Sequence, residues 1–272
     1  GVHGMSESIL SQAAPPADAR IAYGPDRLHF GDLRLPSGAG PHPVVVVVHG
    51  GFWRARYDLE HIGHVCAALT TCGLATWNIE YRRIGDSGGG WPGTFHDVAR
   101  AADYVRELAP QYKLDLQRVV ALGHSAGGHL ATWLAARARI PAADPLFTSN
   151  PLPLLGVISL AGVVDLQQAY ALRLGQRVVA ELIGGSPDAY PERYRSASPA
   201  ALLPLGLPQI LIHGTKDGPV PFQLSADYVR AAQAAGDNAT LVALEGAHHF
   251  EVIDPASAEW AAVEQAVVSL CQ

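Results

Sequence analysis

One serine in this chain has the surroundings that covalent chemistry needs. Ser125 stands in the segment Gly-His-Ser-Ala-Gly-Gly, residues 123–128, between an apolar, β-branched stretch and a run of helix-forming residues. A strand, a Gly-x-Ser-x-Gly turn and a helix together form a nucleophile elbow, which holds a serine hydroxyl above a parallel sheet. Gly123 and Gly127 lack side chains, so strand and helix can approach closely. The context favours a nucleophilic Ser125 over a helix-capping one.

A serine hydroxyl becomes a good nucleophile only when a base takes its proton and an acid orients that base. Asp217 follows an apolar segment, 209–213, that is expected to be a strand. In open α/β sheets, ligands bind at the carboxyl ends of the strands. Its alternative role is that of a turn residue before Gly-Pro. His248 and His249 follow the last apolar segment, and local sequence does not decide between them. The order serine, acid, histidine along the chain is the one expected for a fold with a nucleophile elbow.

An oxyanion hole needs backbone N–H groups that point at the developing negative charge. Ala126, directly after Ser125, is expected to supply one of them. A second should come from the loop after an early buried strand, where the sequence reads His-Gly-Gly-Phe-Trp, residues 49–53. Gly50 and Gly51 let that backbone approach a substrate, so we expect Gly50, Gly51 and Phe52 to complete the hole.

Short apolar segments alternate with helical patterns, which is typical of a mostly parallel sheet covered by helices. Five valines in a row, 44–48, indicate a strand buried on both faces. We expect about eight strands, at 20–23, 27–33, 44–49, 74–79, 119–122, 155–160, 209–213 and 239–244. Helical patterns cover 59–71, 95–109, 126–138, 221–235 and 255–270. Residues 165–203 break this rhythm with one expected helix around 172–183, and we interpret them as a small cap-like insertion after the sixth strand.

Four motifs, at residues 49–53, 123–128, 213–217 and 246–250, resemble those of the α/β-hydrolase superfamily. The resemblance is to esterases with an His-Gly-Gly motif, in the hormone-sensitive-lipase-like and kynurenine-formamidase-like branch. The resemblance covers residues 44–255 and implies a Ser125, Asp217 and His249 triad, because the base in such enzymes commonly precedes an aromatic residue such as Phe250. Phe52 stands where lipase-type relatives have a third glycine. Its ring would narrow the acyl side of the site and favour compact acyl groups.

Several further residues have two possible roles. The expected pocket residues are Phe52, Trp53, Trp91, His124 and Val220, although both tryptophans could equally belong to the core. Glu80 could anchor the oxyanion loop or form an ordinary ion pair with an arginine. Asp165 also follows an expected strand and is an alternative acid, but the context of Asp217 is better. His61 and His64 have a spacing that could hold a metal, but no third ligand accompanies them, so a solvent-facing or satisfied pair is favoured.

The composition excludes several classes of protein. With 16% charged and 49% hydrophobic residues among 272, the chain is globular, and a net charge of −6 without basic clusters argues against nucleic-acid binding. No apolar run is long enough to span a bilayer. Three cysteines without a Cys-x-x-Cys spacing, and no signal peptide after Met5, favour a cytoplasmic location. Met5 is expected to be the natural start, so that residues 1–4 precede it.

The sequence therefore predicts one α/β-hydrolase domain, 19–272, after an N-terminal tail, 1–18. Its expected activity is hydrolysis of carboxylic esters with short acyl groups through an acyl-enzyme, without metal or organic cofactor. The partner is a small-molecule ester or amide, and a homodimer is compatible with the sequence. The alternatives are an arylformamidase, a small peptidase or acyl-aminoacyl hydrolase, and a non-catalytic binding module; the last usually lacks a triad residue.

Overall fold

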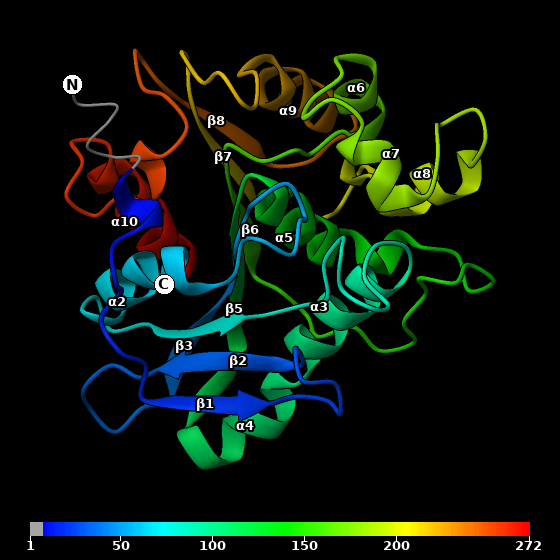
Figure 1. Ribbon diagram of the computed structural model, residues 1–272. Coiled ribbons are helices and arrows are strands. Elements are labelled where there is room, and N and C mark those ends of the chain that lie inside the picture. Colours follow the sequence, from blue (N-terminus) through cyan, green and yellow to red (C-terminus); the bar gives the residue numbers. More distant parts are fainter. Residues whose placement is uncertain (1–7) are drawn as a thin grey trace.

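An eight-stranded sheet forms the centre of the computed structural model, which describes residues 8–272 (Figure 1). The expected start at Met5 lies outside the described residues. The strands are β1 (Ala19–Ala22), β2 (Phe30–Arg34), β3 (His42–Val48), β4 (Ala75–Ile79), β5 (Leu114–His124), β6 (Gly156–Leu160), β7 (Gln209–Gly214) and β8 (Ala239–Leu244). Their order across the sheet is β1-β2-β4-β3-β5-β6-β7-β8.

The direction of the strands changes at one edge only. Strand β2 is antiparallel to both β1 and β4, and the remaining pairs, from β4 to β8, are parallel. Parallel neighbours require crossover connections, which here are helices. The prediction of a mostly parallel α/β sheet with about eight strands is confirmed.

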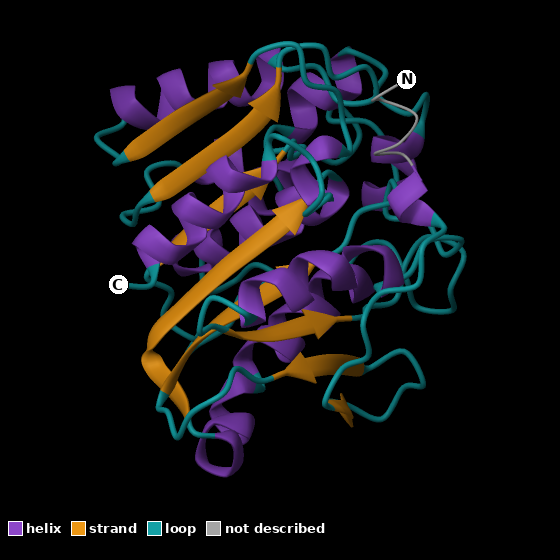
Figure 2. Ribbon diagram, turned by 90° about the vertical axis from the view of Figure 1, so that its left-hand side faces the viewer, coloured by secondary structure: helices purple, strands orange, loops and turns teal. Residues whose placement is uncertain are grey.

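Helices cover both faces of the sheet, as Figures 1 and 2 show. One face carries α2 (Gly63–Thr70) and α10 (Trp260–Leu270), and the other carries α3 (Gly93–Asp103), α4 (Val105–Tyr112), α5 (Ala126–Ala136) and α9 (Gln223–Ala234). Short 3-10 helices are η1 (Ser8–Leu10), η2 (Glu60–Ile62), η3 (Arg137–Arg139), η4 (Pro199–Leu202) and η5 (Glu251–Ile253). In the described part of the chain, no helix combines the length and apolar character that crossing a membrane requires.

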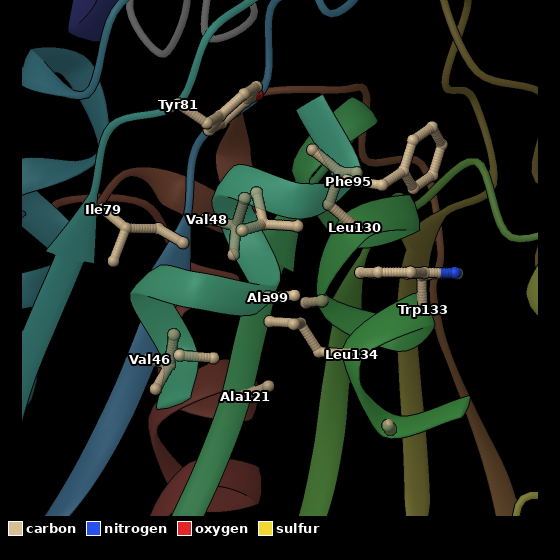
Figure 3. Close-up of a cluster of buried hydrophobic side chains, with 14 of the residues drawn as sticks. Val46, Val48, Ile79, Tyr81, Phe95, Ala99, Ala121, Leu130, Trp133 and Leu134 are labelled. Atoms are coloured by element: carbon tan, nitrogen blue, oxygen red, sulfur yellow. The ribbon is translucent and has the colours of Figure 1, made fainter. Parts of the chain in front are cut away.

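The valine run of β3 explains why this strand lies at the centre. Successive side chains of a strand point to opposite faces, and Val46 and Val48 belong to the core under α3 and α5, together with Leu130 and Trp133 (Figure 3). The alternate residues, Val45 and Val47, belong to the second core, under α2 and α10. Both faces of the strand are therefore buried from solvent.

Three predicted helices differ from the structure. The helix expected over 95–109 is two helices, α3 and α4, separated at Tyr104, and α4 contains Pro110. The last helix begins at Trp260 rather than at 255, because residues 255–259 form turns. The helix expected at 172–183 starts only at Val178.

The segment after β6 is more helical than predicted. It contains α6 (Leu166–Ala171), α7 (Val178–Ile183) and α8 (Pro191–Ala197). Arg173, Gly175 and Gln176 between the first two helices have positive φ angles, which a continuous helix cannot contain. The segment lies against the early loops: the amide of Trp91 donates to the carbonyl of Leu182.

Candidate active site

Ser125 stands at a sharp turn between β5 and α5. Its φ of 60° and ψ of −119° lie outside the regions that a serine usually adopts, and its side chain is buried. The turn depends on its glycines: a Cβ on Gly123 would stand 1.9 Å from the carbonyl oxygen of Gly127, and one on Gly127 would stand 2.0 Å from that of Val48. The predicted strand, turn and helix are all present.

Asp217 and His249 are brought together from two different loops. The first follows β7 and the second follows β8, and Nδ1 of His249 lies 2.6 Å from Oδ2 of Asp217. The amide of Val220 donates to Oδ1 of the same carboxylate at 2.8 Å. Burial alone would raise the pKa of Asp217, but hydrogen bonds from His213 and His249 outweigh burial and lower this pKa below its usual value. Asp217 is therefore an ionised partner for His249.

The two adjacent histidines have different positions. His249 is buried and pairs with Asp217, whereas His248 is partly exposed and lies 3.4 Å from Glu251. His124, just before the serine, contacts the backbone of His249: its Nε2 donates to the carbonyl oxygen of His249 at 2.9 Å. Burial lowers the pKa of His124 well below its usual value, so this ring is neutral at pH 7. Of the two candidate bases, only His249 meets the acid.

A small cavity of about 60 Å³ joins Ser125 to His249. Among the predicted site residues, Gly51, Phe52 and His124 also line it. The remaining lining residues, which sequence reasoning did not place there, are Leu10, Tyr57, His61, Pro219 and Phe250. The walls are thus largely apolar, and a narrow, apolar cavity beside a buried serine is suited to a compact substrate group.

The loop expected to form the oxyanion hole is anchored at its first residue. Nε2 of His49 lies 2.6 Å from Oε1 of Glu80, and the hydroxyl of Tyr81 donates to the carbonyl oxygen of His49 at 2.8 Å. The amide of Leu59 donates to the second oxygen of Glu80. The contact of Glu80 with an arginine is longer: Nη1 of Arg83 lies 3.7 Å from Oε2 of Glu80. Glu80 therefore acts mainly as an anchor of this loop.

The middle of the same loop lies close to the nucleophile. A Cβ on Gly50 would stand 2.6 Å from the carbonyl oxygen of His124, so only glycine allows this approach. Phe52 and Trp53 have φ angles of 53° and 57°, a strained region for aromatic residues. Among the described residues, no hydrogen bond uses the backbone N–H of Phe52 or Ala126. Both amides remain available for a ligand.

Trp53 lies in the core, so its assignment to the pocket is wrong and the core alternative holds. Its side chain is 1% exposed, and Nε1 donates to Nδ1 of His129 at 3.0 Å. His129 in turn donates from Nε2 to the carbonyl oxygen of Ala197. Burial lowers the pKa of His129 to about 4, so the ring is neutral and can accept from the indole. The pair anchors the end of the oxyanion loop.

Two other expected pocket residues also lie away from the cavity. Trp91 is half-buried against Phe95, with the Arg193 guanidinium 5.3 Å from its ring centroid. Val220 is completely buried, and its part in the site is the amide that holds Asp217. The substitute acid Asp165 caps α6 by accepting from the amide of Gln168.

The histidine pair considered for a metal is divided between the cavity and the surface. His61 is buried and lines the cavity, and burial lowers its pKa to about 3. Nε2 of His64 lies 3.2 Å from the carbonyl oxygen of Gln12.

Leu10 belongs to the predicted tail, yet its neighbour Ile9 is buried in the core with α2 and α10. Residues 8–18 thus lie on the domain.

The strand order and a nucleophile elbow after the central strand define an α/β-hydrolase fold, as predicted. The chain belongs to the BD-FAE family, whose model matches residues 32–231. It is 28% identical to esterase LipC and 28% identical to esterase LipQ, both of Mycobacterium tuberculosis, over 87% and 76% of its length. The matches cover 60% and 50% of those two relatives, so the chain spans little more than half of their length.

Solved structures share this fold. A truncated carbohydrate esterase from gut microbiota has a TM-score of 0.79 at 22% identity, with 96% of this chain and 99% of that one covered. An esterase of Thermogutta terrifontis, with propionate bound, has a TM-score of 0.75 at 23% identity, with 93% of both chains covered. The named relatives are esterases, in agreement with the class of enzyme predicted from the sequence.

Proposed function

We propose that this protein is a serine carboxylesterase in which Ser125, His249 and Asp217 form the catalytic triad. The observation that carries the proposal is the 2.6 Å contact between Nδ1 of His249 and Oδ2 of Asp217, at the wall of the cavity that Ser125 lines. This contact places a hydrogen on Nδ1 and leaves Nε2 as the base.

In the proposed reaction, Nε2 of His249 takes the hydroxyl proton of Ser125 while the serine Oγ attacks the ester carbonyl. The same proton then passes to the departing alcohol, which leaves an acyl group on Ser125. His249 then takes a proton from a water molecule that attacks the acyl group, and returns it to Oγ of Ser125 as the acyl–Oγ bond breaks and the acid leaves. Ionised Asp217 stabilises the imidazolium that forms in each half of the reaction.

Backbone amides are the proposed oxyanion hole. The amide of Ala126 and those of Gly51 and Phe52 would donate to the carbonyl oxygen as it becomes negative, and Gly50 gives the loop its close approach to Ser125. The unused N–H groups of Phe52 and Ala126 and the two anchors of the loop, Glu80 and His129, support this role.

The size of the cavity favours short acyl groups. A volume of about 60 Å³, with Phe52 on its wall, has room for a few heavy atoms beyond the carbonyl. A formyl group is the smallest acyl group, so the same cavity supports arylformamidase activity as the second candidate. The two candidates differ in the leaving group: an alcohol or an aromatic amine.

Two measurements test the proposal. A fluorophosphonate should label the protein at Ser125 and should not label Ser125→Ala, whose turnover should fall by about 10⁶-fold because the triad acts as a unit. A panel of p-nitrophenyl esters of increasing acyl length, a feruloyl ester and N-formylkynurenine then ranks the substrates. Acetate and propionate esters should be cleaved fastest. Near-normal turnover by Ser125→Ala would overturn the assignment.

A further inference from the structure

A third histidine, His213, lies behind the acid of the proposed triad. It belongs to β7, its side chain is completely buried, and it is not one of the residues that line the cavity. Its Nε2 lies 2.8 Å from the carbonyl oxygen of Val220 and 3.3 Å from Oδ2 of Asp217. Its Nδ1 lies 2.7 Å from Oγ of Ser225, in α9. One ring thus contacts the acid, its loop and the following helix.

The hydrogen-bond partners determine which nitrogen of His213 carries a hydrogen. A carbonyl oxygen can only accept, so the contact with Val220 requires an N–H at Nε2. The hydroxyl of Ser225 can donate to Nδ1 or accept from it, and therefore tolerates either charge state of the ring. In both states His213 directs its Nε2–H toward Val220 and Asp217.

This donor limits how the Asp217 carboxylate can turn. Oδ1 accepts from the amide of Val220, and Oδ2 lies 2.6 Å from His249 and 3.3 Å from His213. With both oxygens engaged, rotation about the Cβ–Cγ bond would break at least two charge-assisted contacts. The ring of Phe222, edge-on to His213 at 5.8 Å between centroids, fixes the donor itself. The carboxylate therefore keeps Oδ2 toward His249.

We propose that His213 is a positioning residue for catalysis: its Nε2–H orients the Asp217 carboxylate so that His249 stays in its productive orientation. The proposal rests on the triad proposed above. His213 begins the 213–217 turn that carries the acid, but it does not touch the reacting atoms. Its contribution is expected in the chemical step and not in substrate binding, because His213 does not line the cavity.

Two substitutions of His213 separate the donor from the space that the ring fills. In His213→Gln, a side-chain amide N–H can occupy the place of Nε2–H, whereas His213→Met fills similar space without a donor. We expect kcat of His213→Met on p-nitrophenyl acetate to fall by about 10- to 100-fold with little change in KM, and His213→Gln to recover most of it. Ser225→Ala, which removes only the Nδ1 partner, should cost a few-fold.

Proton NMR gives a readout that a merely structural role would not change. The hydrogen between Nδ1 of His249 and Oδ2 of Asp217 gives a low-field signal, which should shift or broaden in His213→Met and return in His213→Gln.

Fluorophosphonate titration counts the folded, active sites, so kcat is expressed per site. A Met variant with wild-type kcat and signal, or a Gln variant no better than Met, would overturn the inference. If Ser125→Ala is inactive while His213→Met is not impaired, this inference alone fails; an active Ser125→Ala defeats the triad itself.

Discussion

Two loops meet at Ser125, and they are held in place by different means. In the acid loop, residues 214–222, the side chain of Asp217 itself receives contacts from the amide of Val220, from His249 and from His213. In the oxyanion loop, residues 49–53, such contacts end on the first and last residues, His49 and Trp53, while the amides between them stay unused among the described residues. The acid loop presents a side chain, whereas the oxyanion loop presents backbone.

This difference determines what mutagenesis can reveal. The acid can be removed by one substitution, so its contribution can be measured directly. Every substitution except proline keeps the backbone N–H. The strained φ angles of Phe52 and Trp53 persist only because the surrounding contacts maintain them. The oxyanion loop must therefore be tested through its anchors, and the expected effects are smaller and partly on stability.

Of the two loops, the acid loop is expected to show the larger effect. Asp217→Asn keeps the shape of the side chain but loses the charge and favours the wrong tautomer of His249, so kcat should fall by about 10⁴-fold at nearly constant KM. Steady-state kinetics on p-nitrophenyl acetate measures kcat and KM of the variant. Asp165→Asn is the matched control, because Asp165 only caps α6 and asparagine caps equally well. Equal losses in both variants would remove Asp217 from the mechanism.

Acid should weaken the two loops in different pH ranges. His129, which anchors the oxyanion loop, has its pKa lowered by burial from 6.5 to about 4. Between these values the unfolded chain binds a proton that the folded protein does not, so the free energy of unfolding falls as pH drops from 6.5 to 4, by up to about 3 kcal/mol. Hydrogen bonds lower the pKa of Asp217 against the effect of burial, so its contribution is lost only as pH falls below about 3.9.

Denaturant unfolding of wild type and His129→Gln between pH 7 and pH 4 measures the first of these ranges. His61 and His124 are also buried and neutral, and both remain in the variant. The difference between the two proteins therefore isolates His129. We expect the variant to be less stable at pH 7 and to lose less stability on acidification. If the free energy of unfolding falls equally with pH in both proteins, His129 is not a buried neutral histidine in the folded protein.

Removing the indole hydrogen bond should loosen the oxyanion loop without touching the acid. Trp53→Phe leaves Nδ1 of His129 without a donor, and we expect kcat to fall by about tenfold and stability by about 1–3 kcal/mol. Trp133→Phe is the control: its indole, shown in Figure 3, is equally buried and donates to the carbonyl oxygen of Ser196, away from the loop. Similar kcat losses in both variants would contradict a specific role for Trp53.

The contrast between the loops also shows what the sequence could predict. Ser125, Asp217 and His249 each follow a strand directly, and parallel strands bring their carboxyl ends to one edge, so strand positions alone place them together. The choice between His248 and His249 needed the family resemblance. For Trp53, local sequence does not reveal whether a side chain after a strand turns toward the cavity or the core. His129, which decides this, lies 76 positions later.

Other parts of the site had no local signal at all. Leu10 lies outside every motif and reaches the cavity only because Ile9 next to it packs under α2 and α10. The sequence pairs His61 with His64, but in the structure only His61 lines the cavity. The break before α7 depends on Arg173 and Gln176, two residues other than glycine with positive φ, which no propensity scale anticipates. Tertiary contacts determine all of these features.

The smallest effect is expected at Leu10, which belongs to neither loop and so tests whether the rest of the wall acts on binding alone. Its side chain is 40% exposed, so Leu10→Ala should leave stability and kcat unchanged and raise KM for short esters by about two- to fivefold through lost apolar contact. Leu116→Ala, at a similarly exposed residue of β5 that does not line the cavity, is the control and should change neither constant. A lower kcat in Leu10→Ala would mean that the wall, like the two loops, helps to orient the catalytic groups, because lost contact with the substrate alone changes only KM.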